Sequence, residues 1–407
     1  MIPLPTSLIA GLGQVHARGN QFTGVQVDSR RIVTGDLFVA VGRGSAFVDD
    51  ALSRGAAAAV VPDDAFAALA RVGSEVRARS RARVVGITGS MGKTSTKDIL
   101  AALCMPVART IPAEASFNNE IGVPLTLCRL DADTEVCILE LAMRGFGQIA
   151  ELCAIARPEI GVVTNVGPVH LELVESIEGV RRAKGELIEA LPPGGTAIVP
   201  ADFEVARDDL DVVHVATPEA HVEDSRTVVA GVSFNFTAAH QVQNAAAALA
   251  VLDALGLPRP EKVDVDFSRW RGDEGELPGG GLLINDAYNA NPVSMRAALA
   301  YLVQRAEGRR RVAILGDMAE LGRTAAEYHR EVGAAAAELG VDEVLAVGDL
   351  ARGYLEAGVR GRWVANVHEA LAALDQVVQP GDAVLVKASR AIGLEAVAEA
   401  LTRVPTA

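Results

Sequence analysis

The chain has few cysteines and no long apolar run, and each shortage excludes a class of protein. The four cysteines among 407 residues show no C-x-x-C spacing and lie inside apolar segments, at Cys104, Cys128, Cys137 and Cys153. We therefore expect buried, reduced thiols rather than disulfides or metal ligands. No apolar run reaches the ~18 residues that a membrane-spanning helix needs, and the first residues lack the features of a signal peptide. These absences predict a soluble, cytoplasmic protein with no membrane insertion.

Positive charge is also scarce. Lysine and arginine total 38 against 52 aspartates and glutamates, so the formal net charge is −14. Because a polyanion requires a concentrated basic face, which the sequence lacks, we exclude a nucleic-acid partner and expect any anionic ligand to be held locally. At about 150 residues per domain, the length predicts two or three domains.

The most informative stretch runs from residue 86 to residue 96, where an apolar segment leads into glycines, one lysine and hydroxyls. This order predicts a buried strand, a loop whose backbone N–H groups approach phosphate oxygens, and a helix whose amino end points at them. Lys93 would reach the β- and γ-phosphates, and Thr94 would bind Mg²⁺. Since Ile87 stands where a strict Walker motif has glycine, the loop is a short variant, and a glycine-rich turn without a ligand is the alternative. The predicted nucleotide-binding residues here are Gly89, Ser90, Met91, Gly92, Lys93, Thr94 and Ser95.

Apolar runs alternate with amphipathic segments along most of the chain. From residue 83 onward this alternation predicts an α/β fold with parallel sheets. The predicted strands lie at 24–27, 37–41, 84–87, 136–139, 160–163, 282–284, 312–315, 344–347 and 383–386, and two predicted helices at 146–157 and 177–191. We divide the chain into a small mixed N-terminal domain (1–82), a central P-loop domain with a parallel sheet (83–275) and a C-terminal Rossmann-like domain (276–407). The glycines at 279–281 are either a hinge or a hairpin-like connection.

Three polar residues are candidates for a site at the carboxyl ends of the parallel strands, where ligands usually bind. Glu140 directly follows a strand and could join Thr94 on Mg²⁺. His170 ends the polar loop 164–170, and Lys184 lies beside the apolar face of the helix 177–191. Taken singly, each has a structural alternative, namely a buried carboxylate, a structural histidine and a solvated lysine.

Together these segments resemble the Mur ligase family of ATP-dependent amide-bond-forming enzymes of peptidoglycan synthesis. The resemblance runs nearly end to end. The motifs that carry it are residues 88–94, 116–124, 164–170, 183–186, 240–244, 285–292, 314–322 and 386–390. Three of them, at 118–124, 286–292 and 315–322, are similar to the family member that adds a dipeptide.

The resemblance implies catalytic roles for Lys93, Lys184, His170 and Arg271. Thr94 and Glu140 would ligate one Mg²⁺, while a carbamate on Lys184 would help His170 to place a second. ATP would also be contacted by further residues that match the family motifs, namely His240, Asn244, Arg271 and Asp286.

The resemblance also implies the substrates. UDP-N-acetylmuramoyl-tripeptide would be the acceptor, contacted by Ser29, Arg30, Asn118 and Asn119. D-alanyl-D-alanine would be the amine donor, at a C-terminal site that includes Asp317, Lys387 and Ser389. We expect a monomer.

Other functions stay open. A GTPase would need an Asn-Lys-x-Asp motif, which is missing from the sequence. A sister ligase that adds a different amino acid and a noncatalytic nucleotide-binding homologue are the remaining alternatives. The chain departs from the family pattern at Ala388, where glycine is usual, and in the abbreviated segments 42–47 and 200–239.

Overall fold

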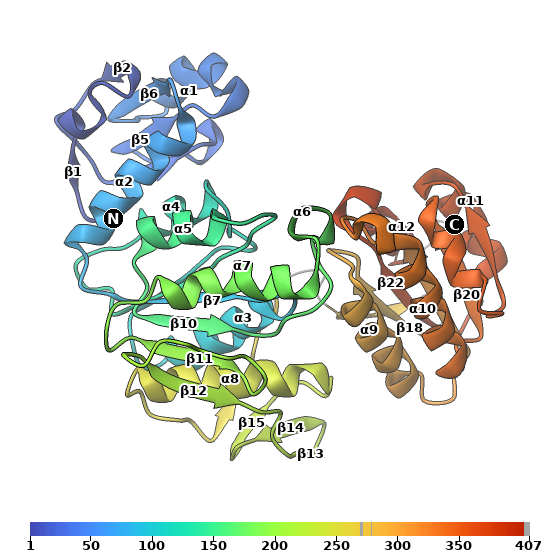
Figure 1. Cartoon of the computed structure of the whole chain (residues 1–407). Coiled ribbons are helices and arrows are strands. Elements are labelled where there is room, and N and C mark those ends of the chain that lie inside the picture. The colour runs from blue at the N-terminus through green and yellow to red at the C-terminus, as the bar shows by residue number, and fades with distance from the viewer. Residues whose placement is uncertain (269–271, 278, 403–407) are drawn as a thin grey trace. The chain divides into compact units, whose positions relative to one another are not determined.

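The computed structural model describes residues 1–268, 272–277 and 279–402 (Figure 1). Its contacts divide the chain into two compact units. The first comprises Met1–Asn165, Arg182–Thr237 and Gln241–Asp266, and the second comprises Val166–Arg181, Ala238–His240 and Phe267–Ala407. Both units contain parallel strands with helices, so the predicted α/β class is confirmed.

The first unit is built around a six-stranded sheet in the order β12-β11-β10-β7-β9-β8, and all of its neighbouring strands are parallel. Its strands are β7 (Arg83–Thr88), β8 (Thr110–Pro112), β9 (Val136–Glu140), β10 (Ile160–Val163), β11 (Thr196–Pro200) and β12 (Asp211–Val215). The helices that follow them along the chain are α3 (Lys93–Cys104), α4 (Gly122–Leu127), α5 (Gln148–Ala156) and α7 (Ile177–Glu189). Because parallel strands end at the same edge, the loops after β7, β9 and β10 are brought together there.

Three smaller sheets complete this unit. The N-terminal sheet has the order β2-β6-β5-β4 and its own core around Phe38, Ala51 and Leu52. Its strands are β2 (Gly13–Ala17), β4 (Gly24–Gln26), β5 (Asp36–Val39) and β6 (Ala58–Pro62), and the helices α1 (Val48–Ser53) and α2 (Ala65–Arg79) lie in the same part of the chain. The strands β1 (Leu4–Pro5) and β3 (Gln21–Phe22) pair with each other in a separate two-stranded sheet. The other sheet joins β13 (Ala220–Glu223), β14 (Arg226–Val229), β15 (Val232–Phe234) and β16 (Lys262–Val263), and α8 (His240–Ala254) precedes its last strand.

The second unit contains a sheet in the order β17-β18-β22-β19-β20-β21, in which only the edge strand β17 is antiparallel to its neighbour. The strands are β17 (Asp273–Leu277), β18 (Gly281–Asp286), β19 (Arg311–Gly316), β20 (Glu343–Val347), β21 (Gly361–Val364) and β22 (Ala383–Lys387). The helices are α6 (Leu171–Val174), α9 (Pro292–Arg305), α10 (Ala325–Glu338), α11 (Val367–Val377) and α12 (Glu395–Thr402).

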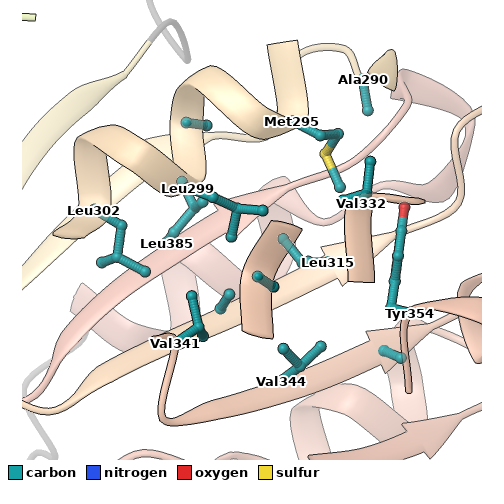
Figure 2. Packing of buried hydrophobic residues seen from close by; sticks show 14 of the residues in the cluster. Ala290, Met295, Leu299, Leu302, Leu315, Val332, Val341, Val344, Tyr354 and Leu385 are labelled. Atoms are coloured by element: carbon teal, nitrogen blue, oxygen red, sulfur yellow. The ribbon is translucent and has the colours of Figure 1, made fainter. Parts of the chain in front are cut away.

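Apolar side chains cover both faces of this sheet. On one face, Met295, Leu299 and Leu302 recur at helical spacing along α9 and pack with Leu315 and Leu385 of the strands (Figure 2). On the other face, a second buried cluster combines the alternate strand residues with α11 and α12. The continuous apolar strands 312–315 and 383–386 therefore mark a sheet that is buried on both sides.

The glycines at 279–281 belong to a hairpin. Leu277 of β17 pairs with Gly281 of β18, and the N–H of Gly280 donates to the carbonyl of Leu277. Gly279 and Gly280 have φ values of +87° and +84°, which glycine adopts without strain. Of the two interpretations drawn from the sequence, the structure supports the hairpin-like connection.

The cysteines are as expected. All four are buried and free, and burial raises the pKa of each thiol to about 12. Across the described ranges, no helix combines the length and apolarity that crossing a membrane requires.

Candidate active site

The glycine-rich loop connects β7 to α3, as the sequence predicts. Gly92 is the residue that precedes the helix, and its φ of +74° lies in the left-handed region. A Cβ atom at this position would stand 2.2 Å from Oδ1 of Asn244 on α8. Only glycine therefore fits here, and the first N–H groups of α3 are directed into the loop.

The loop is held in shape by Lys93, Asn165 and Thr164, whose hydroxyl donates to the carbonyl of Met91. The Nζ of Lys93 donates to the carbonyl of Gly89 at 2.7 Å. Asn165, just beyond the end of β10, accepts the N–H of Met91 on its Oδ1 at 2.9 Å and the N–H of Ser90 on its carbonyl at 3.1 Å. Residues 164–167 were identified from the sequence as a motif, but Asn165 was given no role there. It braces the nucleotide loop from the neighbouring strand.

Glu140 lies beside this loop, in the place that the sequence predicts. It ends β9, its side chain is only 1% exposed, and it pairs in register with Ile87 of β7. Its Oε2 accepts the hydroxyl of Thr94 at 2.9 Å, and its Oε1 accepts the side-chain amide of Asn118 at 2.9 Å. Each carboxylate oxygen is thus held by one hydrogen bond, Oε2 at the amino end of α3 and Oε1 at Asn118.

These donors suit a magnesium ion. Mg²⁺ prefers oxygen ligands and is usually held by one or two carboxylates, water and substrate phosphates rather than by a complete protein cage. The described ranges contain no cluster of three or more His, Cys, Asp or Glu side chains that could hold a metal. The carboxylate of Glu140 with the hydroxyl of Thr94 fits the sparser arrangement, in which a nucleotide supplies the remaining oxygens.

Lys184 is buried against the central sheet rather than solvated. Leu187 on α7 and Leu191 just beyond its end pack on the strands at Gly86 and Gly161, where an added Cβ would meet these two leucines at 3.1 to 3.3 Å. Lys184 lies one turn from Leu187 and is 2% exposed. Burial lowers the pKa of its amine well below the ordinary value, and the Lys93 ammonium lowers this pKa further. This placement favours the neutral form of the amine.

His170 belongs to the second unit. Its Nδ1 contacts the carboxylate of Glu320, and the N–H of Glu172 donates to the carbonyl of Glu320. His170 and Glu320 both have positive φ values, +54° and +63°. Strained backbone of this kind is frequent at functional sites, and a carboxylate on a ring nitrogen fixes which nitrogen carries the proton. The role of His170 as a metal ligand stays a prediction.

The residues predicted to contact the nucleoside lie in both units. In the first, Nδ2 of Asn244 donates to Oε1 of Gln241, whose own amide donates to Oγ of Ser95. In the second, the His240 ring lies edge-on to Tyr301 at a centroid distance of 6.3 Å. Arg271 lies outside the described residues.

The predicted dipeptide-site residues lie close together at one edge of the second sheet. Lys387 is paired with Asp286, its neighbour across β18 and β22, and also donates to the carbonyl of Asn289. Ser389 accepts the N–H of Ala319, while its own N–H donates to the carbonyl of Asp317. These contacts fix the backbone around the predicted site. Asp317 also accepts the N–H of Ala351 at 2.7 Å.

The predicted acceptor-site residues have different environments. Arg30 is 81% exposed and forms an ion pair with Asp28, whereas Ser29 is buried. The Arg30 guanidinium lowers the pKa of Asp28 to about 2. Asn119 accepts the N–H groups of Ile121 and Gly122, so it also shapes the turn before α4.

Comparisons with known proteins agree with this geometry. The Mur ligase middle domain matches residues 87–252, and the Mur ligase glutamate ligase domain matches residues 275–390. A protein of Synechocystis sp. named UDP-N-acetylmuramoyl-tripeptide--D-alanyl-D-alanine ligase is 34% identical, over 92% of this chain and 90% of its own length.

Two solved structures have the same fold over nearly the whole chain. One is MurF from Acinetobacter baumannii, with a TM-score of 0.85 and 26% identity, covering 98% of this chain and 99% of the other. The second is the MurF ligase from Thermotoga maritima in complex with ADP, with a TM-score of 0.75 and 26% identity, covering 93% and 97%.

Proposed function

The chain belongs to the Mur ligase family, and we propose that it joins D-alanyl-D-alanine to UDP-N-acetylmuramoyl-tripeptide in peptidoglycan synthesis, using ATP. The observation that carries the proposal is the arrangement at the loop 89–93, where Lys93, Thr94 and the buried Glu140 converge at the end of the central sheet. The names of the relatives supply the substrates.

The nucleotide is bound by the loop. Its backbone N–H groups and the amino end of α3 offer positive potential to the phosphates. When a nucleotide binds, the Lys93 amine would leave the carbonyl of Gly89 and donate to phosphate oxygens instead. Thr94 and Glu140 would hold Mg²⁺, which supplies charge neutralisation between phosphate groups when bound. A second Mg²⁺ would be held by His170 and by Lys184 in its carbamylated form.

The reaction joins a carboxylate to an amine in two steps. A carboxylate oxygen of the acceptor attacks the γ-phosphorus of ATP, and ADP leaves, which yields an acyl phosphate. The amine of the dipeptide then attacks the acyl carbon, the carbon–oxygen bond to phosphate breaks, and an amide and inorganic phosphate form with loss of one proton. Lys93 and Arg271 would offset the repulsion between the two anions in the first step.

Carbamylation would allow Lys184 to act as a metal ligand. In its neutral form, which burial favours by lowering the pKa, the amine can attack CO₂, forming an N–C bond and releasing a proton, and the product is an anionic carbamate. An ammonium at this place would repel Mg²⁺, whereas a carbamate offers two oxygens. The burial of Lys184 on the sheet side of α7 supports this assignment.

The three-domain division forms part of the proposal. Residues 1–82, with a separate sheet and core, would bind the UDP-sugar through Ser29 and Arg30. Residues 83–275 would bind ATP, with Asn118 and Asn119 beside the muramoyl peptide. Residues 276–407 would bind the dipeptide near Asp317, Lys387 and Ser389 and contact ATP through Asp286.

Donor selectivity distinguishes this function from that of a sister ligase. Phosphate release from ATP is expected only when the UDP-muramoyl tripeptide and D-alanyl-D-alanine are both present. The measurement is a matrix of muramoyl-peptide acceptors against amine donors, with single amino acids among the donors. Robust turnover with L-lysine or D-glutamate, and none with the dipeptide, would overturn the assignment, and no turnover with any pair would indicate a noncatalytic homologue.

Asn165→Ala should weaken nucleotide binding. The substitution removes the acceptor for the Met91 N–H, and an unpaired backbone donor costs about 1–3 kcal/mol, so the Kd for ADP should rise about 5- to 150-fold. Calorimetric titration with ADP measures the change, and thermal unfolding checks that the variant is folded. An unaltered Kd in a folded variant would mean that the loop keeps its shape without this brace.

A further inference from the structure

Lys97 is a buried lysine to which the mechanism gives no role. It lies on α3 one turn beyond Thr94, and its side chain is only 3% exposed. Its Nζ donates to the carbonyl of Ala113 at 3.1 Å and to the carbonyl of Ala115 at 2.8 Å, and it pairs with Asp98 at 3.1 Å. An ammonium carries three N–H donors, and the two carbonyls accept two of them. Lys97 therefore fastens the segment 113–115 to the helix of the nucleotide loop.

The fastened segment leads directly to Asn118. Within it, Ala115 has a φ of +44°, a conformation that costs a non-glycine residue energy and persists only where the surroundings enforce it. Asn118 is itself fixed, because its carbonyl accepts the N–H of Ala142 at 2.9 Å while its side-chain amide donates to Glu140. The position of the Asn118 amide thus depends on how the preceding segment is held.

The contacts form a closed ring that begins and ends on one helix. Thr94 donates to Glu140, Glu140 accepts from Asn118, and the chain from Asn118 back to Ala113 is held by Lys97. Thr94 and Lys97 are three residues apart, which places them on the same side of α3. Thr94 therefore orients one oxygen of the Glu140 carboxylate, and Asn118 orients the other.

We propose that Lys97 is a positioning residue that acts through Asn118 to orient the carboxylate of Glu140 toward a nucleotide-bound divalent cation. The proposal rests on the proposed function, in which Glu140 and Thr94 hold that cation. Groups that orient metal ligands typically change metal affinity 10- to 100-fold when they are removed. If Lys97 only stabilised the fold, its replacement would lower the melting temperature and leave the metal affinity of the folded protein unchanged.

The test is the affinity for Mn²⁺, followed by electron paramagnetic resonance in the presence of saturating ADP. Lys97→Met keeps the apolar stem and removes the donors, and its Mn²⁺ affinity should fall about 10- to 100-fold. Lys262→Met is the matched control, because Lys262 is exposed on β16 and lies in no site described above. Lys97→Gln retains two donors on a shorter stem, and the same direction of change is expected if methionine prevents folding.

A double variant separates positioning from an independent effect. If Lys97 acts through Asn118, the loss of affinity in Lys97→Met with Asn118→Leu should be close to that of the more severe single variant. A loss equal to the product of the two single losses, or an unchanged affinity in folded Lys97→Met, would overturn the proposal. Failure of the unsubstituted protein to bind Mn²⁺ with ADP would refute the proposed function instead.

Discussion

Lys184→Arg is expected to lose turnover by about a hundredfold or more while the protein stays folded, because arginine keeps its charge and cannot form a carbamate. Burial and the nearby Lys93 ammonium hold the pKa of the Lys184 amine well below its ordinary value, which favours the neutral form that reacts with CO₂. The measurement is steady-state phosphate release, with thermal unfolding to check the fold. Lys262→Arg is the matched control at an exposed lysine.

Lys184→Ala tests the same claim if arginine is not tolerated in the buried position. Turnover should be nearly lost and should be partly restored by acetate, which can occupy the vacated space and offer carboxylate oxygens. Crystallographic density at Lys184 would show the adduct directly. An unmodified amine together with fully active Lys184→Arg would contradict the proposal and leave Lys184 a structural residue of α7.

Glu140→Ala should lower kcat by about a hundredfold or more. Removing one preorganised charge partner in a closed site costs on the order of 3 kcal/mol of transition-state stabilisation. Added Mg²⁺ should recover only part of the loss, because the orientation given by Thr94 and Asn118 disappears with the carboxylate. The measurement is the dependence of kcat on Mg²⁺ concentration, with Glu151→Ala on the exposed face of α5 as control.

Glu140→Gln separates charge from packing. Glutamine has nearly the same volume and can still accept a hydrogen bond from Thr94, so the fold should be retained while kcat falls by a similar factor. Near-normal turnover of either variant at ordinary Mg²⁺ would identify Glu140 as a structural carboxylate.

Much of the fold could be predicted because the strands of the two parallel sheets are continuous apolar runs. Segments such as 136–139 and 312–315 are buried on both faces, and burial leaves an unambiguous pattern. The placement of Glu140 beside Thr94 followed from the same logic, since parallel strands end at one edge. Three strands of the central sheet were missed, namely β8, β11 and β12, of which β8 has only three residues and β12 has no buried residue. The antiparallel strands between residues 220 and 234 were missed too, because β13 is fully exposed and the others are only three or four residues long.

Residues that act by bracing were harder to find. Lys97 has the sequence of an ordinary helix lysine, and only the structure brings its amine to the carbonyls of Ala113 and Ala115. Asn165 belongs to a motif recognised from the sequence, but the motif does not indicate which N–H groups donate to Asn165. The contact between His170 and Glu320 joins residues 150 positions apart, a separation at which local pattern carries no information.

In the proposed reaction ATP activates the acceptor as an acyl phosphate, and this intermediate transfers an oxygen atom from the acceptor to phosphate. The acceptor is prepared with ¹⁸O in both oxygens of its reacting carboxylate and is turned over with ATP and D-alanyl-D-alanine. One labelled oxygen should leave with the phosphate and the other should stay in the new amide, so mass spectrometry should find one ¹⁸O in each phosphate released. Amide product accompanied by unlabelled phosphate would exclude an acyl phosphate intermediate.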